Sequence, residues 1–285
     1  MKLMRVGAPG QERPAVHMAD GSVIDVSSVV GDYDAAWLAG GGMAALESRL
    51  REGVDGFPVV DTGAERVGAP IARPGHIMAI GLNYADHAAE SGMDVPSEPV
   101  LFTKAPSSFC GPYDTVLIPR TSEQSDWEVE LGVVIGKEAS YVADEAAAME
   151  HVAGYCIVND VSERDFQLNR GPTWVKGKSA KTFCPTGPWL VSRDEIADPQ
   201  ALAMKLSING ESRQNGNTAT MIFGVAHLVW YLSQFMVLEA GDLIATGTPP
   251  GVGMGMKPPQ YLAPGDVMEL EIDGLGWQRQ EVAQA

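Results

Sequence analysis

The segment from Ser125 to Val134, with the sequence SDWEVELGVV, alternates apolar residues with acidic residues and a glycine. Successive side chains of a strand point to opposite faces, so a period of two predicts a β-strand. Glu128 and Glu130 are then expected on one face, about 7 Å apart along the strand. Two carboxylates at that distance repel each other, and burial strengthens the repulsion, so a buried pair needs a compensating cation. A divalent metal ion that prefers oxygen ligands meets this need.

The same alternation is typical of a strand whose acidic face lies in solvent, because antiparallel sheets often have one hydrated face. The spacing of Glu128 and Glu130 alone does not decide between the two interpretations. A second apolar segment, residues 155–161 with the sequence YCIVNDV, predicts another strand and carries Asp160. An acid inside a buried strand is costly unless it is paired or bound to metal. We therefore expect Asp160 to be a third ligand of the same cation.

Composition restricts the class of protein. The 285 residues suffice for one large domain, or for a large and a small one. The formal net charge of −17 argues against nucleic acid or an anionic membrane as a partner. The sequence has no run of the roughly 18 apolar residues that a membrane-spanning helix needs, and residues 1–10 lack the apolar core of a secretory signal. Three cysteines without a CxxC pair are typical of reduced thiols. We expect a cytoplasmic protein.

The chain divides into two regions. Residues 1–70 hold short apolar segments separated by glycine-rich turns, with one short helix expected near residues 43–51. This pattern predicts a small N-terminal domain rich in β-strands. Residues 71–285 contain further strands with shorter helical segments between them and are expected to form the second, larger domain. The fold class expected for the whole chain is α+β, with β-structure dominant.

A candidate acid–base pair lies in residues 83–92, NYADHAAESG, which predict a short helix ending at Gly92. His87 and Glu90 are three positions apart and therefore share a face of such a helix. A histidine oriented by a carboxylate is a candidate general base, because the carboxylate fixes the tautomer and stabilises the imidazolium. The alternative is a surface ion pair of little energetic value.

Further polar residues are expected around the same cleft. Arg164 and Gln167 lie in a predicted helix over residues 162–169 and can reach toward the acidic strands. The loop 241–255, GDLIATGTPPGVGMG, is rich in glycine, which lets the backbone approach a ligand closely, and Thr248 offers a hydroxyl group.

Three lysines occur in the segment 172–190, namely Lys176, Lys178 and Lys181. They suit an anionic substrate, although lysines on an exposed loop are often simply solvated.

Six blocks of sequence, in this order, resemble the fumarylacetoacetate hydrolase family. They are GLNYADHAAESG, DWEVELGVVIG, GYCIVNDVSERDFQ, GKSAKTFCPTGPWL, MIFGVAHLVWYLSQFMVLEAGDLIATGTPPGVG and LAPGDVMELEIDGLG. The resemblance covers roughly residues 71–280. Residues 1–70 resemble the short N-terminal domain of the family's bacterial members. The chain looks most similar to a subgroup of ureidoglycolate lyase-like proteins and 2,4-dioxo-3-deoxy-sugar-acid hydrolases.

The resemblance implies a mixed β-sandwich roll with a shallow metal site, usually in a homodimer. The implied ligands of Mg²⁺ or Mn²⁺ are Glu128, Glu130 and Asp160. The implied catalytic residues are His87, Glu90 and Lys178, with His87 and Glu90 activating water. The implied substrate-binding residues are Arg164, Gln167 and Thr248.

One position departs from the family pattern. The family often has aspartate in the block GKSxDTF, where this chain has Lys181. Two ammonium groups that lie close together lower each other's pKa. If the absent acid normally steadies Lys178, the pKa and the position of Lys178 are expected to differ from those of the matching lysine in family members that have the aspartate.

These residues and the resemblance predict a metal-dependent hydrolase that cleaves a carbon–carbon bond in a 2,4-dioxo acid. Water activated by His87 would attack C4, and cleavage of the C3–C4 bond would release pyruvate enolate, stabilised by the cation and Lys178. Acylpyruvates and 2,4-dioxo-3-deoxy sugar acids are the expected substrates. The same site could serve a ureidoglycolate lyase, an oxaloacetate decarboxylase or a 2-hydroxyhepta-2,4-diene-1,7-dioate isomerase. Outside the enzymes, the alternative is a metal-stabilised binding protein.

Overall fold

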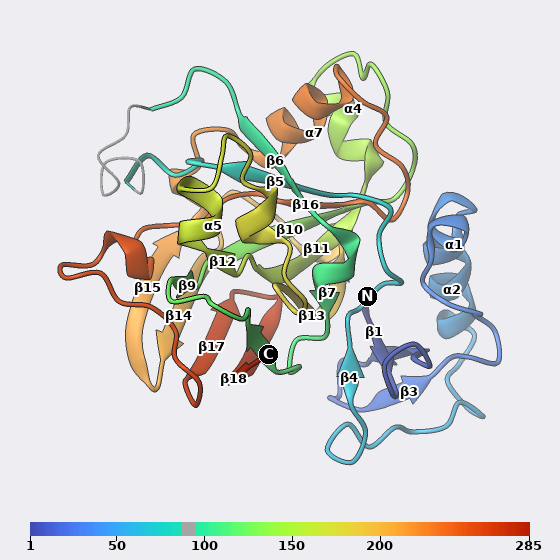
Figure 1. The fold of residues 1–285 in the computed structure, drawn as a ribbon. Coiled ribbons are helices and arrows are strands. Elements are labelled where there is room, and N and C mark those ends of the chain that lie inside the picture. Colours follow the sequence, from blue (N-terminus) through green and yellow to red (C-terminus); the bar gives the residue numbers. More distant parts are fainter. Residues whose placement is uncertain (87–94) are drawn as a thin grey trace.

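The computed structural model describes residues 1–86 and 95–285, and two large β-sheets form its centre (Figure 1). The larger sheet has eleven strands and the smaller has five. Most neighbouring strands are antiparallel, but β16 and β5 are parallel, so the larger sheet is mixed. The predicted α+β class with dominant β-structure is confirmed.

The larger sheet follows the order β3 (Val23–Asp25), β2 (Arg13–His17), β1 (Lys2–Val6), β13 (Cys184–Ser192), β11 (Val152–Asn159), β10 (Val129–Ile135), β16 (Leu243–Ala245), β5 (Ile77–Gly81) and β6 (Val100–Lys104). Two short strands join it at the side, β4 (Val67–Gly68) and β7 (Phe109–Cys110). The smaller sheet follows the order β15 (Glu211–Asn217), β14 (Ala203–Ile208), β17 (Val267–Ile272), β18 (Gly276–Gln284) and β8 (Val116–Ile118). A separate pair consists of β9 (Ser125–Asp126) and β12 (Ser162–Glu163).

The alternation along β10 divides its side chains between two hydrophobic cores. Leu131 and Val133 pack with residues of β14 and β17 in the core between the sheets. Val134 points the other way and packs in a second core with apolar residues of the N-terminal region. Glu130 has the parity of Val134, so its carboxylate leaves the strand on the side away from the sandwich core.

Short helices cover the sheets. The helices α1 (Ala35–Ala39) and α2 (Gly42–Arg51) pack on the second core, while α4 (Glu145–Ala148) and α7 (Val225–Ser233) pack on the sandwich core. The helices α5 (Arg164–Leu168) and α6 (Val175–Lys178) lie in front of β10 and β11 in Figure 1. Among residues 1–86 and 95–285, every helix is too short or too polar to cross a membrane.

The N-terminal region contains the short antiparallel strands that its sequence predicts. Strand β1 also pairs with β13, with Lys2 opposite Val191, so the larger sheet runs from residues 1–70 into the rest of the chain. The second core likewise draws residues from both parts. The division into two domains at residue 70 stays a prediction.

Two local features of the fold are a tight hairpin and a short helix. A hairpin at Asn209 and Gly210 joins β14 to β15, and both residues have the positive φ that such a turn requires. Within the apolar segment 221–237, the helix α7 covers only Val225–Ser233. Met221 instead forms a β-bridge to Tyr84, which keeps the first residues of the segment extended.

Candidate active site

The register of β10 and β11 brings the predicted acidic residues together. Glu130 lies opposite Val158, and the N–H of Asp160 donates a 3.0 Å hydrogen bond to the carbonyl oxygen of Glu128. Glu128 and Asp160 are therefore opposite each other where the two strands leave the ladder. Both share the side-chain parity of Glu130, so all three carboxylates converge on one face.

The three acids form a single buried cluster. Carboxylate oxygens of Glu128, Glu130 and Asp160 lie within 4.8 Å of one another, and all three residues are buried. The alternative of a solvated acidic strand is therefore wrong. The strand predicted over residues 125–134 is interrupted, because β9 ends at Asp126 and β10 begins at Val129.

Side chains take the place of strand partners at this interruption. The N–H of Val129 donates to Oε1 of Gln214 at 2.9 Å, and the indole N–H of Trp127 donates to the carbonyl oxygen of Gly251 at 3.0 Å. These contacts hold the backbone beside Glu128 without a continuous ladder.

Two lysines approach the cluster from different elements. Nζ of Lys178, at the end of α6, lies 2.8 Å from Oε2 of Glu128 and 2.7 Å from Oδ2 of Asp160. Nζ of Lys104, at the end of β6, lies 2.5 Å from Oδ1 of Asp160. Burial alone would lower the pKa of Lys178, but Asp160 and Glu128 outweigh it and raise that pKa. Lys178 is therefore a fixed cation at neutral pH.

Arg164 enters the cluster from the first turn of α5. Its Nε contacts Asp126 at 2.9 Å, and its Nη1 contacts Glu128 at 2.7 Å and Oε1 of Gln167 at 3.1 Å. Burial opposes the charge of Arg164, but Asp126 and Glu128 raise its pKa above the ordinary value. The remaining nitrogen, Nη2, is buried and has no hydrogen-bond partner among the described residues. A buried guanidinium donor without a partner is costly unless a ligand supplies an acceptor.

Among the residues that the structure describes, charge within the contacting group does not balance. Four carboxylates face three cations, and the carboxylate left over is that of Glu130, which accepts a 2.9 Å hydrogen bond from the N–H of Gly247. Burial, followed by Asp160 and Glu128, raises the pKa of Glu130 well above its usual range. One more positive charge would satisfy this acid. Three converging carboxylate oxygens fit a hard divalent cation such as Mg²⁺ or Mn²⁺.

The glycine-rich loop after β16 closes one side of the cluster. Gly247 has a φ of +99°, and a methyl group in its place would lie 2.8 Å from Cβ of Asn83. The hydroxyl of Thr248 donates to the carbonyl oxygen of Val129 at 2.9 Å and accepts from Gln214 at 2.7 Å. Its proton is thus used within the fold, although Thr248 does line the cavity.

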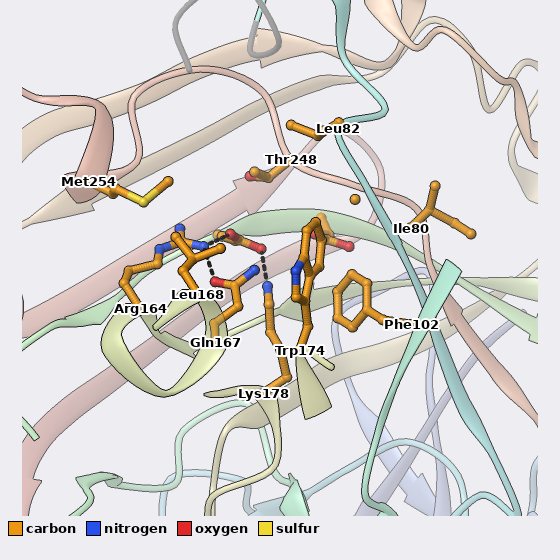
Figure 2. Close-up of a pocket in the computed structure, with 13 residues that line it drawn as sticks. Ile80, Leu82, Phe102, Arg164, Gln167, Leu168, Trp174, Lys178, Thr248 and Met254 are labelled. Atoms are coloured by element: carbon orange, nitrogen blue, oxygen red, sulfur yellow. Dashed lines mark hydrogen bonds and ion pairs between the residues drawn. The ribbon is translucent and has the colours of Figure 1, made fainter. Parts of the chain in front are cut away.

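A cavity opens above the cluster, and Figure 2 shows the side chains around it. It is lined by Ile80, Gly81, Leu82, Phe102, Glu128, Glu130, Arg164, Gln167, Leu168, Trp174, Lys178, Thr248 and Met254. Six elements or loops thus enclose one space that contains the charged groups. Of the predicted site residues that the structure describes, Asp160 alone does not line this cavity, although it contacts Lys178 beneath it.

Lys181 lies elsewhere. It is exposed and lines a different cleft, which it shares with Arg5, Arg66 and Arg73. The expectation that Lys181 lowers the pKa of Lys178 is wrong, since that pKa is raised and the charges acting on it belong to the acidic cluster and Arg164. The third lysine, Lys176, is also exposed and donates to the carbonyl oxygen of Arg170.

The predicted water-activating pair, His87 and Glu90, lies outside the described residues, and its role stays a prediction. The residue Asn83, shortly before it, is firmly held. Its side-chain amide donates to the carbonyl oxygens of Phe223 and Thr246 at 2.9 and 2.8 Å and accepts from the N–H of Phe223 at 2.8 Å.

Three residues of the site were not assigned a role from sequence, namely Lys104, Asp126 and Trp174. Asp126 could have been found, because it continues the two-residue spacing of Glu128 and Glu130. Lys104 ends an apolar strand, which is a weak signal for a buried charge. Nothing in the sequence around Trp174 indicates its place in the cavity.

The profile of the fumarylacetoacetate (FAA) hydrolase C-terminal domain matches residues 76–283. The chain belongs to the fumarylacetoacetate hydrolase family. A fumarylacetoacetate hydrolase from Exiguobacterium antarcticum is 38% identical over the full length of both chains, with a TM-score of 0.84. A Burkholderia multivorans protein, whose name specifies no substrate, is 54% identical over 281 residues, covering 98% of each chain.

Another family member has been solved with ligands. The maleylpyruvate hydrolase from Sphingobium sp. SYK-6, in complex with manganese(II) ion and pyruvate, is 27% identical with full coverage of both chains and a TM-score of 0.83. The family also includes a 2-hydroxyhepta-2,4-diene-1,7-dioate isomerase from Mycobacterium marinum, which is 28% identical, with a TM-score of 0.76 and coverage of 100% of this chain and 98% of that one.

Proposed function

We propose that this chain is a divalent-metal-dependent hydrolase that cleaves the C3–C4 bond of a 2,4-dioxo acid, releasing pyruvate and a carboxylic acid. The observation that carries the proposal is the buried set of three carboxylates, whose charge is not balanced by the described residues. The set lies beside a fixed ammonium and a guanidinium nitrogen that has no partner among those residues. This arrangement offers one position for a cation and two groups for an anionic substrate. The maleylpyruvate hydrolase bound to manganese and pyruvate supports the same chemistry for this chain.

The proposed ligands of Mg²⁺ or Mn²⁺ are Glu128, Glu130 and Asp160. When bound, the cation would add the positive charge that polarises a keto oxygen of the substrate. Lys104 and Lys178 fix both oxygens of Asp160, and Lys178 and Arg164 fix both oxygens of Glu128. The ligand geometry is therefore set before any substrate binds.

The substrate would be oriented by donors on the cavity floor. Nη2 of Arg164 has no partner in the part of the chain that the structure describes, so it suits the C1 carboxylate of the substrate. Oε1 of Gln167 accepts from Arg164, which leaves the amide nitrogen of Gln167 as a donor to a substrate oxygen. Lys178 is held as a cation and would stabilise the negative charge that develops on the pyruvate enolate oxygen.

The bond changes balance without an oxidant or reductant. Water adds to C4 and gives a proton to a base, for which His87, oriented by Glu90, is the proposed residue. The C3–C4 bond then breaks, and its electron pair becomes the enolate of pyruvate. Carbon C3 is protonated, and C4 leaves as a carboxylic acid.

The test is pyruvate release from acetylpyruvate by purified protein, with Mn²⁺ and with chelator. We expect equal amounts of pyruvate and acetate in the presence of Mn²⁺ only. Lys178→Met should lower kcat by about 100-fold, the size expected for losing one group that stabilises transition-state charge. Lys181→Met removes an exposed lysine that lies outside this cavity and should leave kcat within about twofold. Metal-independent release, or full activity of Lys178→Met, would overturn the proposal.

A second candidate within the family is isomerisation of an oxo-diene diacid, favoured by the similarity to the Mycobacterium marinum isomerase. Lys178 and Arg164 would hold a similar enolate in that reaction, but a proton would move between oxygen and carbon and no carbon–carbon σ bond would break. Conversion of a 2-hydroxyhepta-2,4-diene-1,7-dioate without pyruvate release would favour this candidate. Assembly as a homodimer and a place in the cytoplasm also stay predictions.

A further inference from the structure

Much of the cavity lining is apolar. Six apolar side chains line the cavity around the charged groups, and we call them the apolar wall (Figure 2): Ile80, Leu82, Phe102, Leu168, Trp174 and Met254. All charged side chains that line the cavity, among the described residues, are members of the floor: Glu128, Glu130, Arg164 and Lys178. A substrate that places its carboxylate on the floor therefore directs its other end at the wall.

Leu82 has an unusual backbone. Its φ is +55°, in the left-handed region that a branched residue with a Cβ rarely adopts. The neighbouring Asn83, fully buried and held by three side-chain hydrogen bonds, fixes this conformation. Glycine or asparagine would be favoured here on backbone grounds alone. Leu82 keeps this unfavourable backbone conformation and lines the cavity, which suggests that its apolar side chain has a role there.

Trp174 has room in the cavity because Gly81 lacks a side chain. A methyl group at Gly81 would lie 2.4 Å from Cζ3 of Trp174, so the indole ring rests directly on the backbone of β5. Trp174 also packs on Phe102, and the centroids of the two rings are 5.2 Å apart. Phe102 in turn faces Nζ of Lys178 at 4.8 Å. Two members of the wall, Phe102 and Trp174, thus pack on each other, and Phe102 also contacts the charged floor at Lys178.

We propose that the apolar wall receives the substituent beyond C4, and that the acid hydrolysed here carries a hydrocarbon tail instead of a second carboxylate or a polyol. The inference rests on the proposed function, because it assumes that the C1 carboxylate lies on the floor. A tail carboxylate would lie on Leu82 and Trp174 and would lose its hydration without gaining a cation from the described wall. A hydrocarbon tail gains from the same burial.

The binding test uses 2-oxo acids that cannot be cleaved between C3 and C4, titrated calorimetrically into protein supplied with Mn²⁺. The probes are pyruvate, 2-oxooctanoate and 2-oxooctanedioate, of which the last two differ only at the chain end. We expect 2-oxooctanoate to bind at least about 30-fold more tightly than pyruvate, since each buried methylene contributes about fourfold. We expect 2-oxooctanedioate to bind at least about tenfold more weakly than 2-oxooctanoate. Equal or tighter binding of the dioate overturns the inference.

Variants test whether the apolar wall causes the difference in affinity between 2-oxooctanoate and pyruvate. Leu82→Asn keeps a residue that tolerates positive φ and has a similar size, but it makes the wall polar. We expect it to reduce the affinity ratio of 2-oxooctanoate to pyruvate by about tenfold. Val237→Asn alters an exposed apolar residue outside the cavity and should leave the ratio unchanged. An unchanged ratio in Leu82→Asn contradicts the inference.

A turnover series separates this inference from the proposed function. If hexanoylpyruvate is hydrolysed with a higher kcat/KM than acetylpyruvate, both stand. If neither compound releases pyruvate, the proposed function fails, and the binding series still decides whether the wall accepts a hydrocarbon tail. If acetylpyruvate and a carboxylate-ended acylpyruvate are both preferred to hexanoylpyruvate, the function stands and the inference fails.

Discussion

Nζ of Lys104 lies 2.5 Å from Oδ1 of Asp160, and both side chains are fully buried. Lys104 comes from the end of β6, whereas Asp160 follows β11, so this pair joins an edge strand of the larger sheet to its centre. Because Lys178 contacts the other oxygen of Asp160, the carboxylate is held at both ends. The pair therefore sets the position of one proposed metal ligand.

Replacing Lys104 by methionine should destabilise the metal-free protein. The change leaves Asp160 buried with one cation instead of two, and breaking a buried ion pair costs about 3 kcal/mol or more. Unfolding by urea in the presence of chelator measures the loss. Added Mn²⁺ should recover more stability in Lys104→Met than in the wild type, because it restores positive charge at the cluster.

The matched control for this variant is Lys137→Met. Lys137 and Glu150 form an exposed ion pair, and such pairs contribute little to stability. A Lys104→Met protein as stable as the control would show that the buried pair does not hold Asp160.

Gly177→Ala should displace Lys178. A Cβ atom at Gly177 would lie 2.5 Å from the backbone nitrogen of Gln167 and 2.5 Å from the carbonyl oxygen of Glu163. These are backbone atoms of α5 and β12, so α6 must move away and carry Lys178 with it. We expect a loss of about 1–3 kcal/mol in stability and a fall in kcat of about 100-fold.

Thermal unfolding and pyruvate release measure these two effects. Gly31→Ala is the control, because no atom lies within 4 Å of the added methyl group. Wild-type turnover in Gly177→Ala would mean that the contact between α5 and α6 does not position the lysine.

Asp25 predicts a pH dependence in the N-terminal region. Burial raises the pKa of Asp25, but hydrogen bonds from Ser27 and Arg13 outweigh burial and lower that pKa below its ordinary value of 3.8. A depressed folded-state pKa contributes stability above the unfolded-state value and loses it as the pH falls through the folded-state value. Asp25→Asn should therefore cost about 1–2 kcal/mol at pH 7 and progressively less below pH 3.8.

Urea unfolding at pH 7 and at about pH 3 checks this prediction, with Asp55→Asn as an exposed control. The same loss at both pH values would contradict the assigned ion pair and hydrogen bonds.

The alternating pattern of the acidic segment was enough to predict the three carboxylates of the site. The spacing of Glu128 and Glu130 predicted one face, and the lone acid in the next strand predicted the third carboxylate. What the spacing could not supply was burial, which depends on α5 and α6 packing across that face. The interruption at Trp127 was also hidden, because its indole N–H bonds to Gly251, more than 120 residues away.

The cations and the wall depended on contacts that are distant in sequence. Lys104 reaches Asp160 only because β6 and β11 belong to one sheet, and Trp174 lines the cavity only because Gly81 lacks a side chain. The wrong expectation for Lys181 has the same origin. Three positions separate it from Lys178, but α6 ends between them and the chain turns toward another cleft.

The central claim is that three buried carboxylates bind one divalent cation, and calorimetric titration of Mn²⁺ into metal-free protein tests it most directly. We predict one Mn²⁺ per chain, with affinity reduced about 100-fold or more in Glu130→Gln, which removes the unbalanced charge. Glu150→Gln, which alters an exposed acid, should bind like the wild type. Wild-type protein that binds no Mn²⁺, or Glu130→Gln that binds it equally well, would contradict the claim.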